Sequence, residues 1–270
     1  MNSIDLAYYV CAVPTENQNR LTRRRSLFES LKNAQFEGAT LEKLVSPSEW
    51  IQSYQEAFDA LTRYNLPAKR IMHSVIWMYH PQTDKYFPIG YWDSHGFNQY
   101  KNVLHFEPSG VVGVNLSFYK AMREFLNTNK EGLLWLEDDA VLDRNWTKDF
   151  MRLLSRAPSD WDVINLGEYP NDTISIRDEH KLEALDFYLP YAPYRCHCVL
   201  ISRTGADKFM KFLELHGSIL PLDWILFNVR SPEVRDGDPI YFNTYFVNPD
   251  TVRICPWSSH YADSSLTTIF

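Results

Sequence analysis

Apolar residues recur along the chain in a pattern that predicts alternating strands and helices. The run from Leu6 to Val13 is apolar throughout, which is typical of a buried strand. The segment Leu21–Ala34 has apolar residues at helical spacing and therefore predicts a helix. A second helix is expected within Pro47–Tyr64, with Ser46 or Ser48 as its N-cap.

The same alternation resumes in the second half of the chain. The pattern predicts strands over Leu133–Leu136, Val163–Leu166 and Val199–Ser202, and helices after Gly110–Val114, over Trp146–Leu154 and through Ala206–Leu213. Strands that alternate with helices indicate an α/β fold with a mostly parallel, twisted sheet covered by helices on both faces. No internal repeat or interdomain linker is found, so one domain over residues 1–270 is expected.

The periodicity fades over residues 65–108, a stretch that is rich in aromatic residues. These are Trp77, Tyr86, Phe87, Tyr91, Trp92, Phe97 and Tyr100. The stretch is expected to be an irregular insertion. Its rings either supply stacking platforms for a sugar on the acceptor side of a site or fill small satellite cores.

Composition and charge exclude several classes of protein. The 270 residues carry a net charge of −7, whereas nucleic-acid binding needs a dense basic surface. No apolar run is long enough to span a membrane and no secretory signal is present, so a cytoplasmic protein without a transmembrane segment is expected. Four cysteines without a CxxC pair indicate neither a disulfide framework nor a zinc site. The triplet Cys196-His197-Cys198 is interpreted as buried strand, because neighbouring strand residues point to opposite faces.

Three consecutive acidic residues, Glu137, Asp138 and Asp139, interrupt the apolar stretch that begins at Leu133. Buried carboxylates must be paired, protonated or bound to a cation, since desolvating an unpaired charge is costly. In an open α/β sheet ligands bind beyond the carboxyl ends of strands, where this run falls. Hard oxygen ligands favour Mg²⁺ or Mn²⁺, which also bind a substrate diphosphate. The alternative is that Asp138 and Asp139 merely end the strand and that one of them caps the next helix.

Six short motifs follow one another along the chain: Leu21–Leu27 (LTRRRSL), Gly110–Ser117 (GVVGVNLS), Leu136–Asp139 (LEDD), Trp161–Gly167 (WDVINLG), Leu200–Ala206 (LISRTGA) and Pro221–Trp224 (PLDW). In order and spacing they resemble glycosyltransferase family 25, which includes bacterial lipopolysaccharide galactosyltransferases and collagen galactosyltransferases. The resemblance covers most of the chain outside residues 65–108. One departure is Phe118, where the family commonly has His after the Leu-Ser pair.

The resemblance implies a single domain of the GT-A type, a UDP-sugar donor and inversion at the anomeric carbon. The transferred sugar is expected to be galactose or another hexose, and the acceptor a glycan, a lipid-linked molecule or a protein. The metal, Mn²⁺ or Mg²⁺, is expected to bind Asp139 together with Glu137 or Asp138 and to neutralise the departing diphosphate. GT-A enzymes often take a further metal ligand from a C-terminal histidine, which by chain order is His260; the alternative is a surface histidine.

The remaining roles combine residue chemistry with the resemblance. Asp223, an isolated carboxylate in an apolar setting, is the candidate general base, with Glu168 in reserve; alternatively Asp223 caps a helix that begins at Trp224. Arg23 and Arg24 are candidates to bind the diphosphate or nucleotide together with Glu137 and Asp138, or are solvated helix charges.

Two other functions remain open from the sequence. One is a family member without catalysis that binds sugar through the same fold. The other is a metal-dependent phosphoester hydrolase, which would use an acidic strand end with water as the nucleophile.

Overall fold

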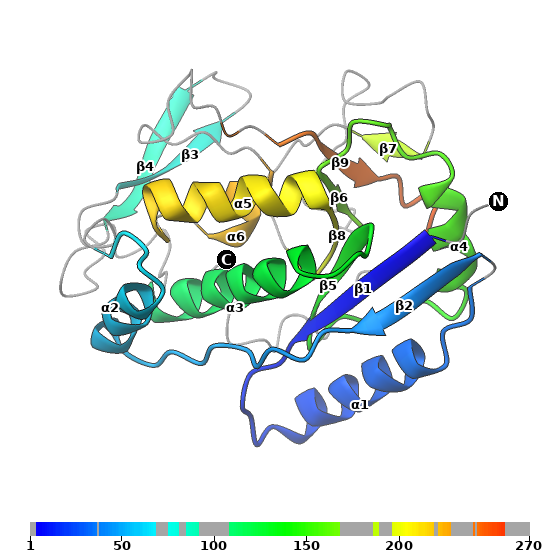
Figure 1. Cartoon of the computed structure of the whole chain (residues 1–270), viewed down its shortest axis with the longest axis horizontal. Coiled ribbons are helices and arrows are strands. Elements are labelled where there is room, and N and C mark those ends of the chain that lie inside the picture. Colours follow the sequence, from blue (N-terminus) through cyan, green and yellow to red (C-terminus); the bar gives the residue numbers. More distant parts are fainter. Residues whose placement is uncertain are drawn as a thin grey trace.

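The computed structural model describes residues 4–36, 38–68, 75–80, 85–91, 108–167, 186–188, 196–218, 221–227, 240 and 242–256. Within them the fold is α/β, as the alternating pattern predicted. A seven-stranded sheet forms the centre, in the order β2-β1-β5-β8-β6-β9-β7 (Figure 1). The strands are β1 (Ile4–Cys11), β2 (Ala39–Lys43), β5 (Gly132–Glu137), β6 (Val163–Asn165), β7 (Phe187–Tyr188), β8 (Cys198–Ser202) and β9 (Thr244–Val247).

The sheet is mixed, so the expectation of a mostly parallel sheet is wrong. The pairs β1–β2, β1–β5 and β6–β9 are parallel. Strand β8 runs antiparallel to both β5 and β6, and β7 runs antiparallel to β9. A central strand reads as an apolar run whichever way it points, because both of its faces are buried. The apolar pattern therefore located β8 but carried no information on its direction.

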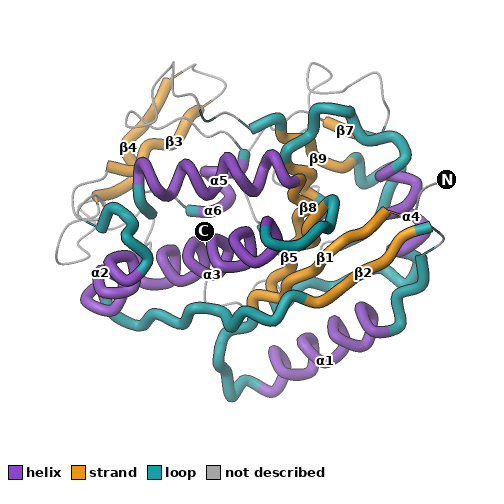
Figure 2. The backbone as a smooth tube through the Cα atoms, viewed as in Figure 1, coloured by secondary structure: helices purple, strands orange, loops and turns teal. Residues whose placement is uncertain are grey.

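Helices cover both faces of the sheet, as expected (Figure 2). The helices are α1 (Gln18–Lys32), α2 (Tyr54–Arg63), α3 (Pro108–Leu126), α4 (Trp146–Leu154), α5 (Arg203–His216) and α6 (Leu222–Leu226). One core lies beneath α1 and α4, and the other lies beneath α2, α3, α5 and α6. Residues of β1 alternate between them: Tyr9 enters the second core and Val10 the first. This period of two is what a strand buried on both faces requires.

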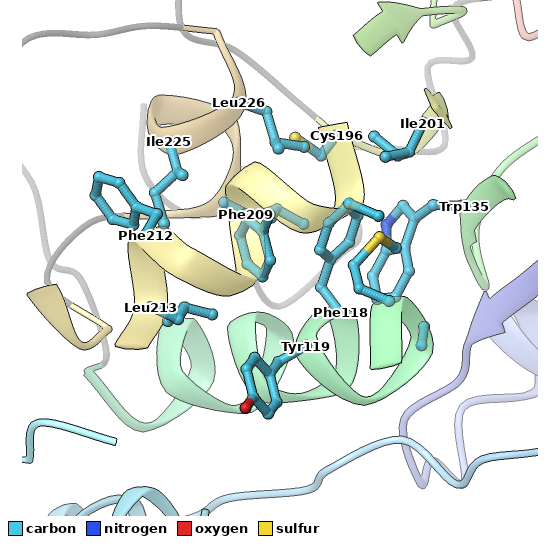
Figure 3. Packing of buried hydrophobic residues seen from close by; sticks show 14 of the residues in the cluster. Phe118, Tyr119, Trp135, Cys196, Ile201, Phe209, Phe212, Leu213, Ile225 and Leu226 are labelled. Atoms are coloured by element: carbon cyan, nitrogen blue, oxygen red, sulfur yellow. The ribbon is translucent and has the colours of Figure 1, made fainter. Parts of the chain in front are cut away.

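Aromatic rings fill the core between the sheet and helices α3 and α5, which lie side by side (Figure 3). Trp135 of β5 stacks on Tyr9 with 5.1 Å between ring centroids. Phe118 forms T-shaped contacts with Trp135 and Phe209, with 4.8 and 4.6 Å between ring centroids. Phe118 is fully buried and occupies a core position of α3, where glycosyltransferase family 25, which the sequence motifs resemble, commonly has His.

Several elements differ from the sequence expectations. Within the stretch expected to be irregular, β3 (Val75–His80) and β4 (Lys85–Tyr91) form an antiparallel hairpin. Helix α2 begins later than predicted, and Ser53 caps it by accepting a hydrogen bond from the Glu56 amide. Ser48 does not cap a helix; its hydroxyl contacts the Tyr9 hydroxyl and accepts from the Ala12 amide at 3.0 Å. No described helix has the length and apolarity needed to cross a membrane.

Gly205 marks a close approach between α5 and the end of the loop before β6. A Cβ atom at this position would lie 2.3 Å from the backbone oxygen of Asp162. Because that oxygen also accepts the Ser202 amide, it cannot shift without loss of a hydrogen bond. We expect Gly205→Ala to lower the free energy of unfolding by about 1–3 kcal/mol, measured by urea denaturation. Thr204→Ala, at the exposed neighbouring position, is the control; equal stability of the two variants would contradict the prediction.

Glu124 of α3 holds the segment that follows β2. Its carboxylate accepts hydrogen bonds from the amides of Val45 and Ser46 at 3.0 and 2.9 Å. Partial burial raises the pKa of Glu124, but these hydrogen bonds outweigh burial and leave the pKa below its ordinary value. A lowered folded-state pKa adds stability that is present above the unfolded-state pKa and is lost as the pH falls.

We therefore expect Glu124→Gln to flatten the loss of stability between about pH 5 and pH 3. The measurement is the urea midpoint as a function of pH. Glu29→Gln, an exposed change on α1, serves as the matched control and should keep the slope of the unaltered protein. Identical slopes for all three proteins would show that the Glu124 contacts do not persist in solution.

Candidate functional site

The acidic run lies where β5 leaves the sheet, as predicted. Glu137 is the last residue of β5, and Asp138 and Asp139 form the turn that follows. The backbone holds this turn from both sides: the Asp138 amide donates to the Cys11 oxygen at 3.1 Å, and the Glu137 amide donates to the His197 oxygen at 2.9 Å. The run therefore sits beside the carboxyl end of β1, which is parallel to β5.

Neither acidic residue of the turn caps a helix. Helix α4 begins at Trp146, and its N-cap is Asn145, whose side chain makes no capping hydrogen bond. The simple alternative, in which Asp138 or Asp139 serves as a helix cap, is thus wrong. Both carboxylates are nevertheless buried, with 0% and 4% of the residue exposed. Their burial needs another explanation, and the three acids of the run have three different surroundings.

Asp138 is paired with arginines from α1. Arg20 donates from Nε and Nη2, the latter at 2.7 Å from Oδ1. Arg24 donates from Nε at 3.0 Å to Oδ2, and its Nη2 also contacts this oxygen. Both oxygens of Asp138 are therefore engaged by guanidinium groups. Arg24, which was predicted to bind the donor, thus lies beside the acidic run. Arg20 lies there too, but it was not among the predicted site residues.

Asp139 lacks such a partner. Its Oδ1 atom is buried and has no hydrogen-bond partner among the described residues. Burial has the largest effect on the pKa of Asp139 and raises it, and the charge of Asp138 adds to this rise. The charges of His197, Arg20 and Arg23 lower the pKa, but the net shift is upward. A buried carboxylate oxygen without a partner is costly, and a cation would satisfy it.

Glu137 is the third acid, and its pKa lies far above the ordinary value of a glutamate. Burial raises its pKa to about 8, and the charges of Asp139, Asp138 and Asp223 add to this effect, while His197 opposes it. At neutral pH this carboxyl group is mainly protonated when no cation is bound. The electrostatic effect of Asp223 also shows that the candidate base lies close to the acidic run.

Asp223 does not cap the helix on which it lies. Helix α6 begins at Leu222, and its N-cap is Pro221. The Asp223 side chain is half-buried in the first turn of α6, and its charge raises the pKa of both Glu137 and Cys196. The structure thus brings a fourth carboxylate, 84 residues further along the chain from Asp139, towards the same edge of the sheet.

His197 is a neighbour of this site that the sequence analysis assigned only to a buried strand. Its ring packs against Gly167, where a Cβ atom would lie 2.4 Å from Cε1. The Cys255 thiol lies near the ring and influences its pKa. Burial lowers the pKa of His197, but Cys255, Asp139 and Glu137 more than offset this and raise it. The only signal in the sequence was a polar residue inside an apolar run, and that signal does not identify its partners.

Other predicted site residues lie elsewhere. Arg23 is half-buried on α1 and is close enough to lower the pKa of Asp139. Glu168 and His260 lie outside the described residues. The four cysteines are buried and reduced.

The residues present are compatible with a hard divalent cation. Among the described side chains, no group of three or more His, Cys, Asp and Glu is arranged to hold a metal ion. A Mg²⁺-type site shared with a substrate diphosphate commonly uses only one or two carboxylates, with phosphate and water oxygens as the other ligands. Asp139, with its unsatisfied oxygen, and Glu137 meet that smaller requirement. Comparisons with protein-family models and with curated proteins give no match.

Proposed function

We propose that this chain is a metal-dependent glycosyltransferase of the GT-A type. In this proposal it transfers galactose or another hexose from a UDP-sugar to a hydroxyl group of a glycan, lipid-linked or protein acceptor, with inversion. The observation that carries the proposal is the buried Oδ1 of Asp139, just after β5, which has no hydrogen-bond partner in the part of the chain that the structure describes. The order of the six sequence motifs supports it, and so does the α/β fold.

The proposed metal is Mn²⁺ or Mg²⁺, held by Asp139 and Glu137, with His260 as a further candidate ligand. When bound, it supplies positive charge that neutralises the leaving diphosphate. Arg23 lies near Asp139 and is proposed to add a guanidinium contact to the same diphosphate. Loss of a proton from Glu137 accompanies its use as a ligand, because metals bind the ionised form.

Asp223 is proposed as the general base of the transfer. Inversion requires the acceptor hydroxyl to attack from the face opposite the diphosphate and to lose its proton to a nearby group. The Asp223 carboxylate is half-buried and is electrostatically coupled to Glu137, so it belongs to the same region without being part of the acidic turn. Glu168 remains the reserve candidate for this role.

The test is thermal unfolding of the protein with a panel of nucleotide sugars, with and without Mn²⁺. A donor present at about 100 times its Kd stabilises the folded state by about 2.7 kcal/mol, which raises the melting temperature measurably. We expect a UDP-hexose to give this shift only with metal, and UDP release to require an acceptor as well. Phosphate release without an acceptor would instead identify a phosphoester hydrolase. Stabilisation by free sugar without any turnover would identify a sugar-binding module, and a flat panel would contradict the proposal.

A further inference from the structure

Asp138 occupies the centre of an ion triad that links two parts of the chain. Arg20 and Arg24 are one helical turn apart on α1, and their guanidinium groups converge on a carboxylate with no exposed surface. Only 12% and 19% of the two arginine side chains are exposed. Arginine forks that contact a buried carboxylate through several N–H groups are the strong, geometrically restrictive form of the ion pair.

The triad also fixes the loop after β1. Nη2 of Arg24 donates to the backbone oxygen of Val13 as well as to Asp138. Helix α1, the loop after β1 and the turn after β5 are thus joined through a single group of side chains. The backbone bond from the Asp138 amide to Cys11 adds a second tie between the same two strand ends. The turn that contains Asp139 is consequently held in place by both the backbone amide and the side chain of Asp138.

The hydrogen bonds leave Asp138 poorly placed to ligate a cation. Each of its oxygens accepts from at least two N–H groups, so the lone pairs that a metal would use are engaged. The two guanidinium groups also carry one more positive charge than Asp138 can neutralise. A cation in direct contact with Asp138 would meet that surplus, whereas Asp139 keeps an oxygen without a partner.

We propose that Asp138 is a positioning residue and not a metal ligand, and that the Arg20–Asp138–Arg24 triad orients the turn so that Asp139 can bind the metal. The triad acts through Asp139, in the way that outer-shell hydrogen bonds orient the ligands of metal sites. This inference rests on the proposed function and deepens it, because it assigns a role to Arg20 and separates Asp138 from Asp139.

The decisive variants replace an arginine by lysine, which keeps the positive charge but lacks the planar guanidinium group with its several N–H donors. Arg20→Lys and Arg24→Lys preserve the positive charge near the metal, so a change in metal affinity reports on geometry. We expect each to raise the Kd for Mn²⁺ by about 10-fold, as measured by electron paramagnetic resonance of free Mn²⁺, and to lower kcat with little change in the KM for the acceptor. Arg25→Lys, exposed on the same helix, is the matched control and should change neither value.

If Asp138 were itself a ligand, loosening its arginines would leave Mn²⁺ affinity unchanged or increase it, which is the opposite sign. A double-mutant cycle gives a second readout: Arg20→Lys combined with Asp138→Asn should bind Mn²⁺ no more weakly than Asp138→Asn alone. If the effects of Arg20→Lys and Asp138→Asn on Mn²⁺ affinity add, or if the lysine variants bind Mn²⁺ normally, the positioning role of the triad is wrong while the proposed function stands. Absence of Mn²⁺ binding by the unaltered protein, with or without UDP, overturns both. Melting temperatures of all variants establish that a change in Kd does not come from unfolding.

Discussion

Asp139→Asn is expected to reduce the proposed metal-dependent sugar transfer by about 10²–10³-fold, the range found when one preorganised group that stabilises developing charge is removed. Asparagine has nearly the same shape, so the turn after β5 should persist. It lacks the negative charge of the carboxylate, so its amide oxygen binds a divalent cation more weakly. The buried Oδ1 of Asp139 has no partner among the described residues, so the proposed metal binding should depend most on this residue.

The same substitution should not destabilise the metal-free protein. Burial raises the pKa of Asp139, which means that its charged form costs free energy in the folded state. A neutral amide avoids that cost, so we expect a melting temperature equal to or above that of the unaltered protein in EDTA. Initial rates of UDP release and melting curves provide the two measurements. Asp207→Asn, an exposed change on α5, is the control. Full activity of Asp139→Asn would remove the acidic turn from the mechanism, and lost activity with a much lower melting temperature would assign Asp139 a structural role.

Placement of the acidic run was predictable from the sequence because it depends on local pattern. An apolar stretch that ends in three acids predicts a buried strand with carboxylates at its end, and β5 and its turn have that arrangement. A buried carboxylate can be in one of three states: paired, protonated or bound to a cation. In the structure Asp138 is paired with arginines, and burial raises the pKa of Glu137 to about 8, which favours protonation. Asp139 keeps an oxygen that a cation would satisfy.

Partners that come from distant segments were not predictable in this way. Arg20 lies one helical turn before Arg24, and its contact with Asp138 spans 118 residues of sequence. Helical spacing alone shows that the two arginines share a face, but not which carboxylate they meet. His197 likewise reaches the site only because β8 pairs antiparallel with β5, a strand direction that an apolar run does not record. Sequence periodicity therefore predicted most helices and strands. The contacts that distinguish the three acids could be identified only in the structure, because they join segments far apart in the sequence.

Whether a helix or strand was predicted also depended on the length and continuity of its apolar pattern. Helices α4 and α5 have amphipathic patterns and lie close to their predicted positions, whereas α3 begins at Pro108, earlier than predicted, and includes Gly110–Val114. Strands β7 and β9 comprise two and four residues and were not predicted, whereas β6, with three residues, was found because its apolar run continues to Leu166. The β3–β4 hairpin was missed because its aromatic and polar residues do not alternate cleanly.

Glu137 predicts an unusual dependence of stability on pH in the metal-free protein. Burial raises its folded-state pKa to about 8, compared with an ordinary value of 4.5. Between these values the folded protein retains a proton that the unfolded chain has lost. The contribution of Glu137 to stability is therefore fully present below the ordinary pKa and is lost as the pH rises through about 8.

Glu137→Gln should remove this dependence, because the amide does not titrate. We expect the free energy of unfolding of the unaltered protein, relative to Glu137→Gln, to fall by about 2–4 kcal/mol between about pH 5 and pH 9 in EDTA. Other titrating groups cancel in the difference between the two proteins. Mn²⁺ should restore much of the lost stability at the upper end of this range in the unaltered protein but little in the variant, because the proposed metal site uses the ionised Glu137 carboxylate. Parallel stability curves for the two proteins in EDTA would show that Glu137 titrates normally, and the carboxyl end of β5 would then be more open to water than its burial indicates.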